Sequence, residues 1–247
     1  MDRRFSPLGD CGVRISFGHN ISPSIGQKMM NVKRKIEESG WKGITDIVPS
    51  YTTLSVFYDP FEMTYVELCM KLEILLTETN EQETVEPSIY HIPVCYEEPF
   101  NIDLKQVAHM NQLTEREVIE IHSERLYYIY MLGFLPGFPY LGRMDTRIAT
   151  SSLHTPRLKV TAGSVGIAGE QTGIYPIESP GGWRIIGKTP IEIYSPDRET
   201  PILFSSGHYV HFYPVTYEEY LLIERDVKKG NFRVKTTIYK GEEDVSN

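Results

Sequence analysis

The segment Gly182–Thr189 (GWRIIGKT) fits the phosphate-binding pattern G-x-x-x-x-G-K-[ST] at every position. In such a loop the backbone N–H groups surround phosphates, while a lysine and a hydroxyl, here Lys188 and Thr189, serve the terminal phosphate and Mg²⁺. The pattern needs a helix directly after it, but Pro190 follows at once and the next residues alternate like a strand. Because the residues between the two glycines are also β-forming, we predict a strand ending in a turn instead of a nucleotide site.

A second candidate for chemistry is Ser164, which lies among glycines in Ala162–Gly169 (AGSVGIAG). A hydrolase nucleophile on a sharp strand-to-helix turn requires G-x-S-x-G, and Ala162 stands where the first glycine should be. The glycines also miss the G-x-G-x-x-G spacing of a dinucleotide fold. We therefore expect Ser164 to be a turn residue or a hydroxyl that contacts a ligand.

The seven histidines show no metal-binding spacing, because neither H-x-H nor H-E-x-x-H occurs. His208 and His211 point to opposite faces if they share a strand. The three cysteines are far apart and form no C-x-x-C, so we predict reduced thiols, no disulfide framework and no metal site. His154 is the exception of interest, since it lies near Arg157 in a segment rich in glycine and proline.

Aromatic residues beside Gly and Pro mark two further segments, Leu132–Gly142 (LGFLPGFPYLG) and Ser179–Trp183 (SPGGW). Such turns either form tight barrel corners or bring backbone and rings to the rim of a small-molecule pocket. Polar groups for that pocket would come from Tyr140, Arg157, Gln171 and Tyr175. Residues 133–190 include six Lys or Arg but only three Asp or Glu. This local net charge of +3 favours an anionic ligand.

The first third of the chain carries strands and helices that alternate. A helix begins after Ser22-Pro23 and ends at Gly40, and Thr64 with Glu67 opens a second helix. The predicted strands are Val13–Phe17, Ile44–Val48, Leu54–Tyr58 and Ile89–Tyr96. The order β-α-β-β-α-β is that of a ferredoxin-like (split βαβ) domain, and it contains no active-site motif.

The polar stretch Thr77–Pro87 is predicted to be a linker, which gives an α/β domain over residues 1–86 and a second domain over residues 87–247. After two short helical patterns, Asp103–Met110 and one opening at Thr114, the second domain turns to β structure. Residues 133–190 hold 10 of the 19 glycines and 6 of the 16 prolines, and many short strands with such punctuation indicate a barrel or sandwich. Phe232–Tyr239 is expected to add one strand before a polar, fraying end.

Composition narrows the class of protein. The chain has 247 residues, 40% of them hydrophobic and 23% charged, which is an ordinary globular balance. Its net charge of −8 argues against general binding to nucleic acids or anionic membranes. No apolar run approaches the ~20 residues of a membrane span, and the N-terminus does not read as a signal peptide. We expect a cytoplasmic protein.

Four blocks in fixed order resemble one bacterial family, which comprises the B subunit of 5-oxoprolinase, allophanate hydrolase subunit 1 and the KipI-type inhibitor of a histidine kinase. The blocks are Tyr130–Gly142, Thr155–Gly169, Gln171–Pro176 and Ser179–Pro190. The family usually reads V-P-A-G-S, where this chain has Thr161 in place of the proline. It also usually carries a Gly-Asp pair near the end, where this chain has Gly207-His208. The resemblance implies a ferredoxin-like N-terminal domain followed by a cyclophilin-like β-barrel.

The resemblance also implies a substrate pocket in the barrel, shared with a partner protein. The residues expected at that pocket are Phe138, Tyr140, His154, Arg157, Ser164, Gln171, Tyr175, Gly181, Gly182 and Trp183. Among them, Arg157, Ser164 and Gln171 could donate hydrogen bonds to a developing oxyanion. No complete nucleophile–base pair is visible in the sequence, so no catalytic residue is assigned.

By the same resemblance, the activity is that of a non-autonomous subunit of an ATP-dependent 5-oxoprolinase, which converts 5-oxoproline, ATP and water to glutamate. ATP is the implied co-substrate of the complex. The implied partners are the C subunit of 5-oxoprolinase, which resembles allophanate hydrolase subunit 2, and a third oxoprolinase subunit. Two alternatives remain at this stage: inhibition of histidine kinase autophosphorylation, and a role beside allophanate hydrolase or urea carboxylase.

Overall fold

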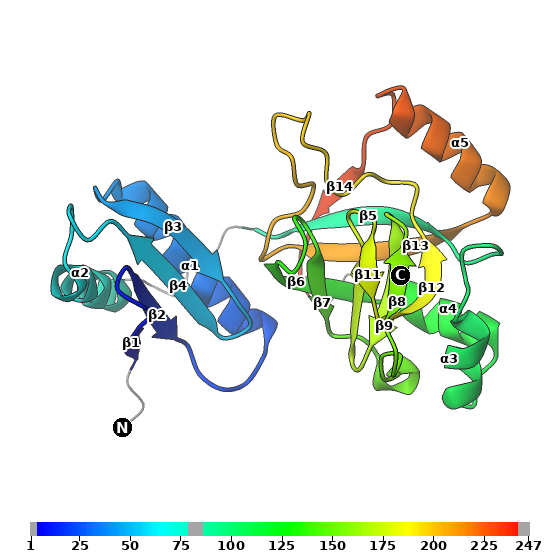
Figure 1. Ribbon diagram of the computed structural model, residues 1–247, viewed down its shortest axis with the longest axis horizontal. Helices are drawn as coiled ribbons and strands as arrows, with labels where there is room; N and C mark the ends of the chain where they lie inside the picture. The colour runs from blue at the N-terminus through cyan, green and yellow to red at the C-terminus, as the bar shows by residue number, and fades with distance from the viewer. Residues whose placement is uncertain (1–3, 79–85, 242–247) are drawn as a thin grey trace. The chain divides into compact units, whose positions relative to one another are not determined.

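The computed structural model describes residues 4–78 and 86–241 (Figure 1). The chain divides into two compact units, residues 1–85 and 86–247, and each has a hydrophobic core of its own. We call them the N-terminal unit and the barrel unit. No helix within the described ranges is both long enough and apolar enough to cross a membrane.

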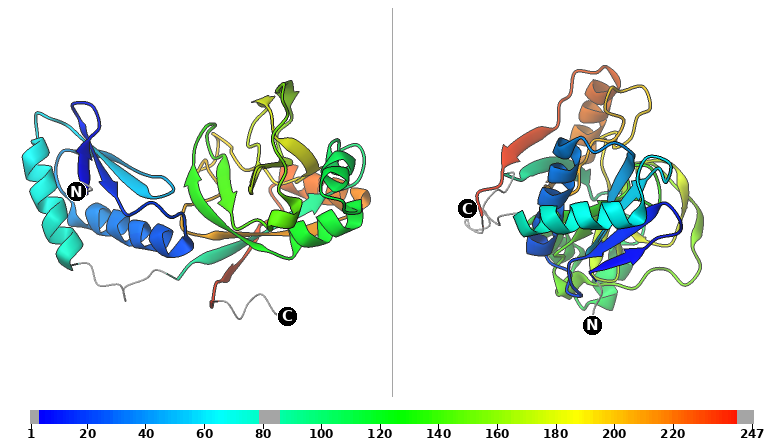
Figure 2. Two further views of the ribbon diagram at one scale, coloured as in Figure 1. Left: turned by 90° about the horizontal axis from the view of Figure 1, so that it is seen from below. Right: turned by 90° about the vertical axis from the view of Figure 1, so that its left-hand side faces the viewer.

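The N-terminal unit is an antiparallel sheet with two helices packed on one face (Figure 2). Along the sheet the order is β1 (Phe5–Pro7), β2 (Gly12–Ser16), β4 (Thr53–Tyr58) and β3 (Ile44–Pro49). The helices are α1 (Pro23–Ser39) and α2 (Tyr65–Glu78). Alternate strand residues and one stripe of each helix meet in the core, as expected for two layers that each bury one face.

The ends of α1 follow the signals in the sequence. Ser22 has an extended backbone and its hydroxyl accepts a hydrogen bond from the Ile25 N–H, while Pro23 occupies the first turn. Gly40 ends the helix in the left-handed conformation with φ 59°, and its N–H donates to the Glu37 carbonyl. The predicted helix is therefore confirmed at both ends.

The predicted closing strand of the first domain was wrong. The run Ile89–Tyr96 forms β5 (Ser88–Cys95), which belongs to the barrel unit, and the edge of the N-terminal sheet is taken by β1, paired with β2. β5 lies parallel to β13 (Tyr209–Val215) over seven residues, from Ile89 opposite Tyr209 to Cys95 opposite Val215. A partner so distant along the chain leaves no mark in local periodicity. Residues 79–85 of the predicted linker lie outside the described part.

The barrel unit closes seven strands into a ring, in the order β12-β9-β10-β7-β6-β13-β5 and back to β12 (Figure 1). Lys188 opposite Cys95 closes the ring. The five strands not yet bounded are β6 (Leu126–Leu132), β7 (Pro139–Gly142), β9 (Ser164–Ala168), β10 (Gln171–Ile174) and β12 (Arg184–Lys188). Their inward side chains form one core, so the predicted barrel is confirmed.

Shorter elements surround the ring. β14 (Lys235–Ile238) pairs with β5, within the predicted strand at residues 232–239, while 242–247 of the predicted fraying end lie outside the described residues. β8 (Arg157–Val160) and β11 (Ser179–Gly181) form a separate two-stranded ribbon. The helical elements are α3 (Leu104–Met110), α4 (Glu115–Ser123), the 3₁₀ turn η1 (Thr146–Ile148) and α5 (Tyr217–Lys228). We did not predict α5, although its capping box, Thr216 with Glu219, is readable in the sequence.

A buried polar chain links α4 to the barrel wall. His122 is fully buried, and its Nδ1 lies 2.8 Å from the Tyr96 hydroxyl and its Nε2 2.9 Å from Thr172 Oγ1. The Thr172 hydroxyl donates in turn to the Gly166 carbonyl at 3.0 Å. Burial lowers the pKa of His122 to about 3, so the side chain is neutral.

Candidate functional site

Six of the ten residues predicted for the site lie together on the outer side of the barrel wall. The rings of Phe138, Tyr140, Tyr175 and Trp183 form what we call the aromatic cluster. Phe138 is at its centre, with ring centroids 5.2 Å from Tyr140, 5.4 Å from Tyr175 and 5.2 Å from Trp183. Phe138 and Tyr175 are buried, whereas Tyr140 and Trp183 are half-buried and form the rim.

Glycines make room for these rings. A Cβ on Gly173 would lie 2.9 Å from Trp183 Cζ3 and 3.1 Å from Phe138 Cζ, and a Cβ on Gly181 would overlap the Tyr175 ring. Gly182 lies against the loop before β8, where its carbonyl accepts a hydrogen bond from the Leu153 N–H at 2.7 Å. Because glycine has no side chain, the rings can pack directly against the backbone at these positions. This close packing explains why these segments contain both glycines and aromatic residues.

Arg157 joins this region through an ion pair that sequence reasoning missed. Its Nη2 donates to Asp103 Oδ1 at 2.6 Å, and Asp103 Oδ2 accepts from the Ile185 N–H at 2.7 Å. Asp103 is 4% exposed and precedes α3, so from the sequence alone it reads only as a helix start. The buried carboxylate is thus satisfied by one guanidinium and one backbone amide.

The hydroxyl of Tyr175 lies in the same surroundings. Burial raises the pKa of Tyr175, and the Trp183 backbone and the Arg157 charge partly offset that rise. The phenol therefore stays protonated near neutral pH. It can donate a hydrogen bond, but it does not serve as a ready base.

The remaining predicted residues lie around the cluster. Ser164 begins β9, is 5% exposed, and has its Oγ 3.2 Å from Thr161 Oγ1, inside a turn in which Gly163 has φ 82°. Ser164 thus lies where a turn passes into a strand, and its role as a hydroxyl that contacts a ligand stays a prediction. Gln171 is the first residue of β10 and lies on the same face of that strand as Gly173, two residues later. His154 is exposed on the loop before β8.

A separate cavity of about 630 Å³ lies at the end of β12 that carries Lys188, and we call it the groove. Three of the sequence blocks that carry the family resemblance contribute to its wall: Ala162 and Gly163 from one, Pro176 from the next, and Lys188 with its neighbours from the last. Residues of α5 form the opposite side. The lining residues are Ala162, Gly163, Pro176, Ile177, Glu178, Lys188, Thr189, Pro190, Ile191, Glu192, Tyr194, Tyr220, Glu224, Val227 and Lys228.

Charges in the groove are unevenly paired. Lys228 Nζ lies 2.7 Å from Glu224 Oε2, and the Tyr220 hydroxyl donates to the other oxygen of Glu224 at 3.3 Å. Lys188 is half-buried, with its Nζ 5.3 Å from the centre of the Phe100 ring. Burial lowers the pKa of Lys188, Glu224 opposes that change, and Lys228 adds to it.

The structure confirms that Gly182–Thr189 is not a phosphate-binding loop. Its centre is the barrel strand β12, and the described chain continues through an irregular segment instead of a helix. Thr189 is 2% exposed and its Oγ1 accepts from the Ile191 N–H at 3.2 Å, so the hydroxyl is not available to a magnesium ion. Among the described residues, no group of three or more His, Cys, Asp or Glu side chains is arranged to hold a metal.

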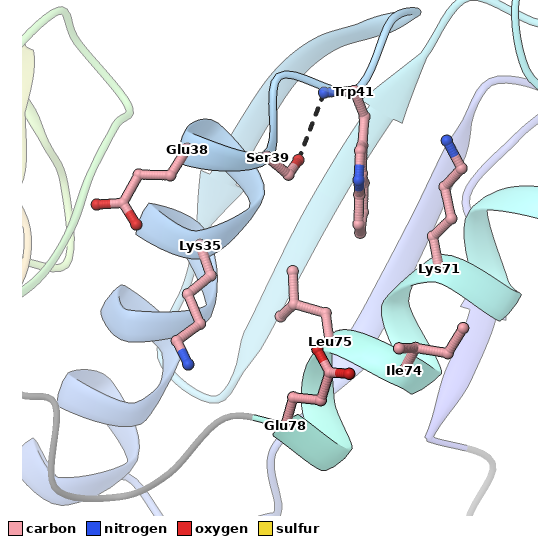
Figure 3. Close-up of a pocket in the computed structure, with 8 residues that line it drawn as sticks. All are labelled: Lys35, Glu38, Ser39, Trp41, Lys71, Ile74, Leu75 and Glu78. Carbon is pink, nitrogen blue, oxygen red and sulfur yellow. Dashed lines mark hydrogen bonds between the residues drawn. The ribbon is translucent and has the colours of Figure 1, made fainter.

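The N-terminal unit has a cavity of its own, about 520 Å³, between the C-terminal halves of α1 and α2 (Figure 3). The Trp41 ring stands between the two helices, and Lys71 Nζ lies 5.4 Å from its centre. The lining of this cavity also includes Lys35, Glu38 and Glu78, which carry charges of both signs. None of the sequence blocks singled out above contributes to this cavity, so it is not part of the candidate site.

Comparison with known proteins comes from both sequence and structure. The family described as carboxyltransferase domain, subdomain C and D, matches residues 3–204. A Bacillus subtilis (strain 168) protein, named as the B subunit of 5-oxoprolinase, is 41% identical over 223 residues, which cover 86% of this chain and 93% of that protein. The crystal structure of PH0987 from Pyrococcus horikoshii is 44% identical, with a TM-score of 0.52, over 87% of this chain and 99% of that one. TTHA0988 is 33% identical with a TM-score of 0.74; the match covers 83% of this chain but only 40% of that longer one.

Proposed function

This chain belongs to the family of the 5-oxoprolinase B subunit, and from that premise we propose that it is a non-autonomous subunit of an ATP-dependent 5-oxoprolinase. The observation that carries the proposal is the similarity to the Bacillus subtilis protein over 93% of that protein's length. The complex would convert 5-oxoproline, ATP and water to glutamate, ADP and phosphate. We place this ATP-consuming complex in the cytoplasm.

In this proposal the barrel unit shapes and orients the lactam while ATP activates it. Opening a five-membered lactam near neutral pH is unfavourable without coupling, and ATP can supply an activated acyl phosphate that water then hydrolyses. Arg157 and Gln171, both partly exposed, carry donors on one side of the barrel wall. Such donors stabilise negative charge that develops on a carbonyl oxygen.

Completion of the site by a partner is supported by what this chain lacks. Within the described parts of the aromatic cluster and groove, the hydroxyls of Ser164 and Thr189 are bonded to Thr161 and Ile191, and neither meets a histidine or carboxylate. A nucleophile without a base is inert. We propose that the C subunit and a third oxoprolinase subunit provide the missing catalytic groups and the nucleotide site.

Exposed apolar side chains beside the cluster support a partner surface. Phe134 is 68% exposed with its ring 5.7 Å from that of Phe138, and Leu158 on β8 is 92% exposed. Aromatic and aliphatic side chains of this kind are frequent in the centres of protein interfaces.

We also propose the finer fold names. The β2-α1-β3-β4-α2 order and the positions of β2, β4 and β3 in the sheet support a ferredoxin-like N-terminal unit whose fourth position is filled by β1. The seven-stranded ring supports a cyclophilin-like barrel. Neither name implies prolyl isomerase activity, because function depends on the site and not on the fold.

The test is 5-oxoproline-dependent ATP hydrolysis by the chain alone and by the chain co-expressed with its genomic partner subunits. We expect activity only in the assembly, and at least a tenfold loss in Arg157→Ala and Gln171→Ala. Lys105→Ala is the matched control, because Lys105 is an exposed cation of the barrel unit, on α3, and does not line the groove. A stable assembly without turnover would overturn the proposal in favour of kinase inhibition or another amide substrate.

A further inference from the structure

The groove is lined by segments that the sequence analysis singled out. It contains a half-buried cation, Lys188, to which the proposed function assigns no role. Lys188 ends β12 and lines the cavity, whereas the other groove lysine, Lys228, is paired with Glu224 at 2.7 Å. Among the described residues no carboxylate lies within 4 Å of the Lys188 ammonium. It rests near the face of Phe100, which compensates for lost water only in part.

Arg157, the cation expected to meet an anionic substrate, is already engaged. Its Nη2 lies 2.6 Å from the buried Asp103, which neutralises the pair. Lys188 by contrast keeps three N–H donors for a ligand. A partly desolvated ammonium facing a cavity gains more from a bound carboxylate than an exposed one does, because screening there is weaker.

The walls around Lys188 suit a small apolar body. Pro176, Ile177, Pro190 and Ile191 line the groove together with Tyr194. Of its three carboxylates, those of Glu178 and Glu224 are paired with lysines, and the third belongs to Glu192, which is exposed to solvent. Gly163 has φ 82°, and a Cβ there would lie 2.5 Å from the Thr189 carbonyl oxygen, so this part of the wall remains bare backbone. A ring that carries one carboxylate matches one unpaired cation and an apolar lining.

We propose that the groove binds a small cyclic carboxylate, with the Lys188 ammonium holding the carboxylate. The inference rests on the proposed function for the identity of the ligand, the lactam acid 5-oxoproline. Lys188 thus becomes the residue that selects a lactam acid over a neutral lactam, while Arg157, held by Asp103, keeps its proposed role as a donor to the lactam carbonyl.

The first experiment is an NMR titration of the ¹⁵N-labelled chain alone with 5-oxoproline and with 2-pyrrolidone, the same lactam without its carboxylate. We expect 5-oxoproline to shift the amide signals of residues 162–163 and 188–192, and 2-pyrrolidone to bind about 10- to 100-fold more weakly, as loss of a charge-assisted hydrogen bond predicts. Lys188→Met should weaken 5-oxoproline binding by the same factor, and Lys188→Arg should retain most of it.

Lys105→Met is the control for a lost lysine, because Lys105 is exposed on α3 and does not line the groove. The melting temperature of each variant shows that it is folded. The second experiment measures the KM and kcat of the assembled complex. Lys188→Met should raise the KM for 5-oxoproline at least tenfold and change kcat little, because the carboxylate keeps its charge and its contact with Lys188 throughout the reaction, so the lost binding affects the ground state and the transition state alike.

The outcomes separate the two proposals. Lys188-dependent binding without turnover of 5-oxoproline would overturn the proposed function and leave the groove as a carboxylate site. Turnover with a KM insensitive to Lys188→Met, or binding that does not change when Lys188 is replaced, would overturn the groove and leave the proposed function standing.

Discussion

His122 shows how one buried residue is fixed in a single chemical form. The Thr172 hydroxyl has one proton and donates it to the Gly166 carbonyl, so Thr172 can only accept from His122. His122 therefore carries its proton on Nε2, and its Nδ1 accepts from the Tyr96 hydroxyl. Every polar atom of this chain of hydrogen bonds has a partner, so burial does not leave an unpaired group.

This network predicts a loss of stability in acid. The pKa of His122 is about 3 in the folded chain, against roughly 6.5 when unfolded. The folded state prefers the neutral form, so its stabilisation is complete above about pH 6.5 and is lost as the pH falls toward 3. The free energy of unfolding should fall by up to about 1.4 kcal/mol per pH unit in that window.

Urea denaturation at several pH values between 7.5 and 5 measures this slope. His122→Gln is the matched variant, because glutamine keeps a donor for Thr172 and an acceptor for Tyr96 but does not titrate. Its slope should be smaller by about one proton, while the lowered pKa values of His91, His208 and His211 leave a remainder in both proteins. Equal slopes would contradict the assignment.

At the residue scale, the sequence predicted the members of the aromatic cluster but not the pairing of its charge. Phe138, Tyr175 and Trp183 stand beside glycines and prolines, and that local pattern is visible in one dimension. The contact of Asp103 with Arg157 spans 54 residues and depends on α3 packing against β12, which no local spacing encodes. Lys188 was considered only within the phosphate-loop pattern, which was rejected in favour of a strand ending in a turn.

At the scale of elements, strand β10 packs so closely against the aromatic cluster that there is no room for a side chain at Gly173. The backbone of Gly173 has an ordinary strand conformation, so an alanine there would not strain it. Its methyl group would, however, lie only 2.9 Å from Trp183 Cζ3 and 3.1 Å from Phe138 Cζ. We expect Gly173→Ala to lower the free energy of unfolding by about 1–3 kcal/mol through overpacking.

Thermal unfolding and tryptophan fluorescence report this change, since the Trp183 ring must shift. Gly133→Ala is the control, because a Cβ at Gly133 would have no heavy atom within 4 Å and the φ angle there is not left-handed. A Gly173→Ala protein as stable as Gly133→Ala, with unchanged emission, would show that the cluster is looser than these contacts indicate.

Elements with strong local signals were predictable and elements defined by distant partners were not. α1 was readable because its cap, its apolar stripe and its stop all lie within one segment. β5 was given to the wrong sheet, since its partner β13 follows far along the chain. α5 was readable but not predicted: Tyr220, Ile223 and Val227 stand at helical spacing and pack toward the barrel core, and a capping box marks its start.

The whole molecule consists of two units that each keep their own strands. All four strands of the first sheet come from residues 1–85, and all seven barrel strands come from residues 86–247. A polypeptide of residues 86–247 should therefore fold by itself, with a single cooperative unfolding transition and the NMR shifts of the groove retained.

Circular dichroism during heating and the 5-oxoproline titration of that polypeptide provide the measurement. A polypeptide without a cooperative transition would show that the barrel needs the first 85 residues. A folded piece that has lost the groove signals would contradict the groove's assignment to the barrel unit alone.

The pairing of β5 with β13 also determines when, during synthesis, the barrel can complete its folding. The first strand of the ring is made early, but its parallel neighbour leaves the ribosome about 120 residues later, as the contact of His91 with His211 illustrates. The N-terminal unit can fold during translation, whereas the barrel must wait with apolar strands uncovered. The uncovered strands are prone to aggregation during this interval. Any partner that recognises the closed barrel can join only after synthesis has passed residue 215.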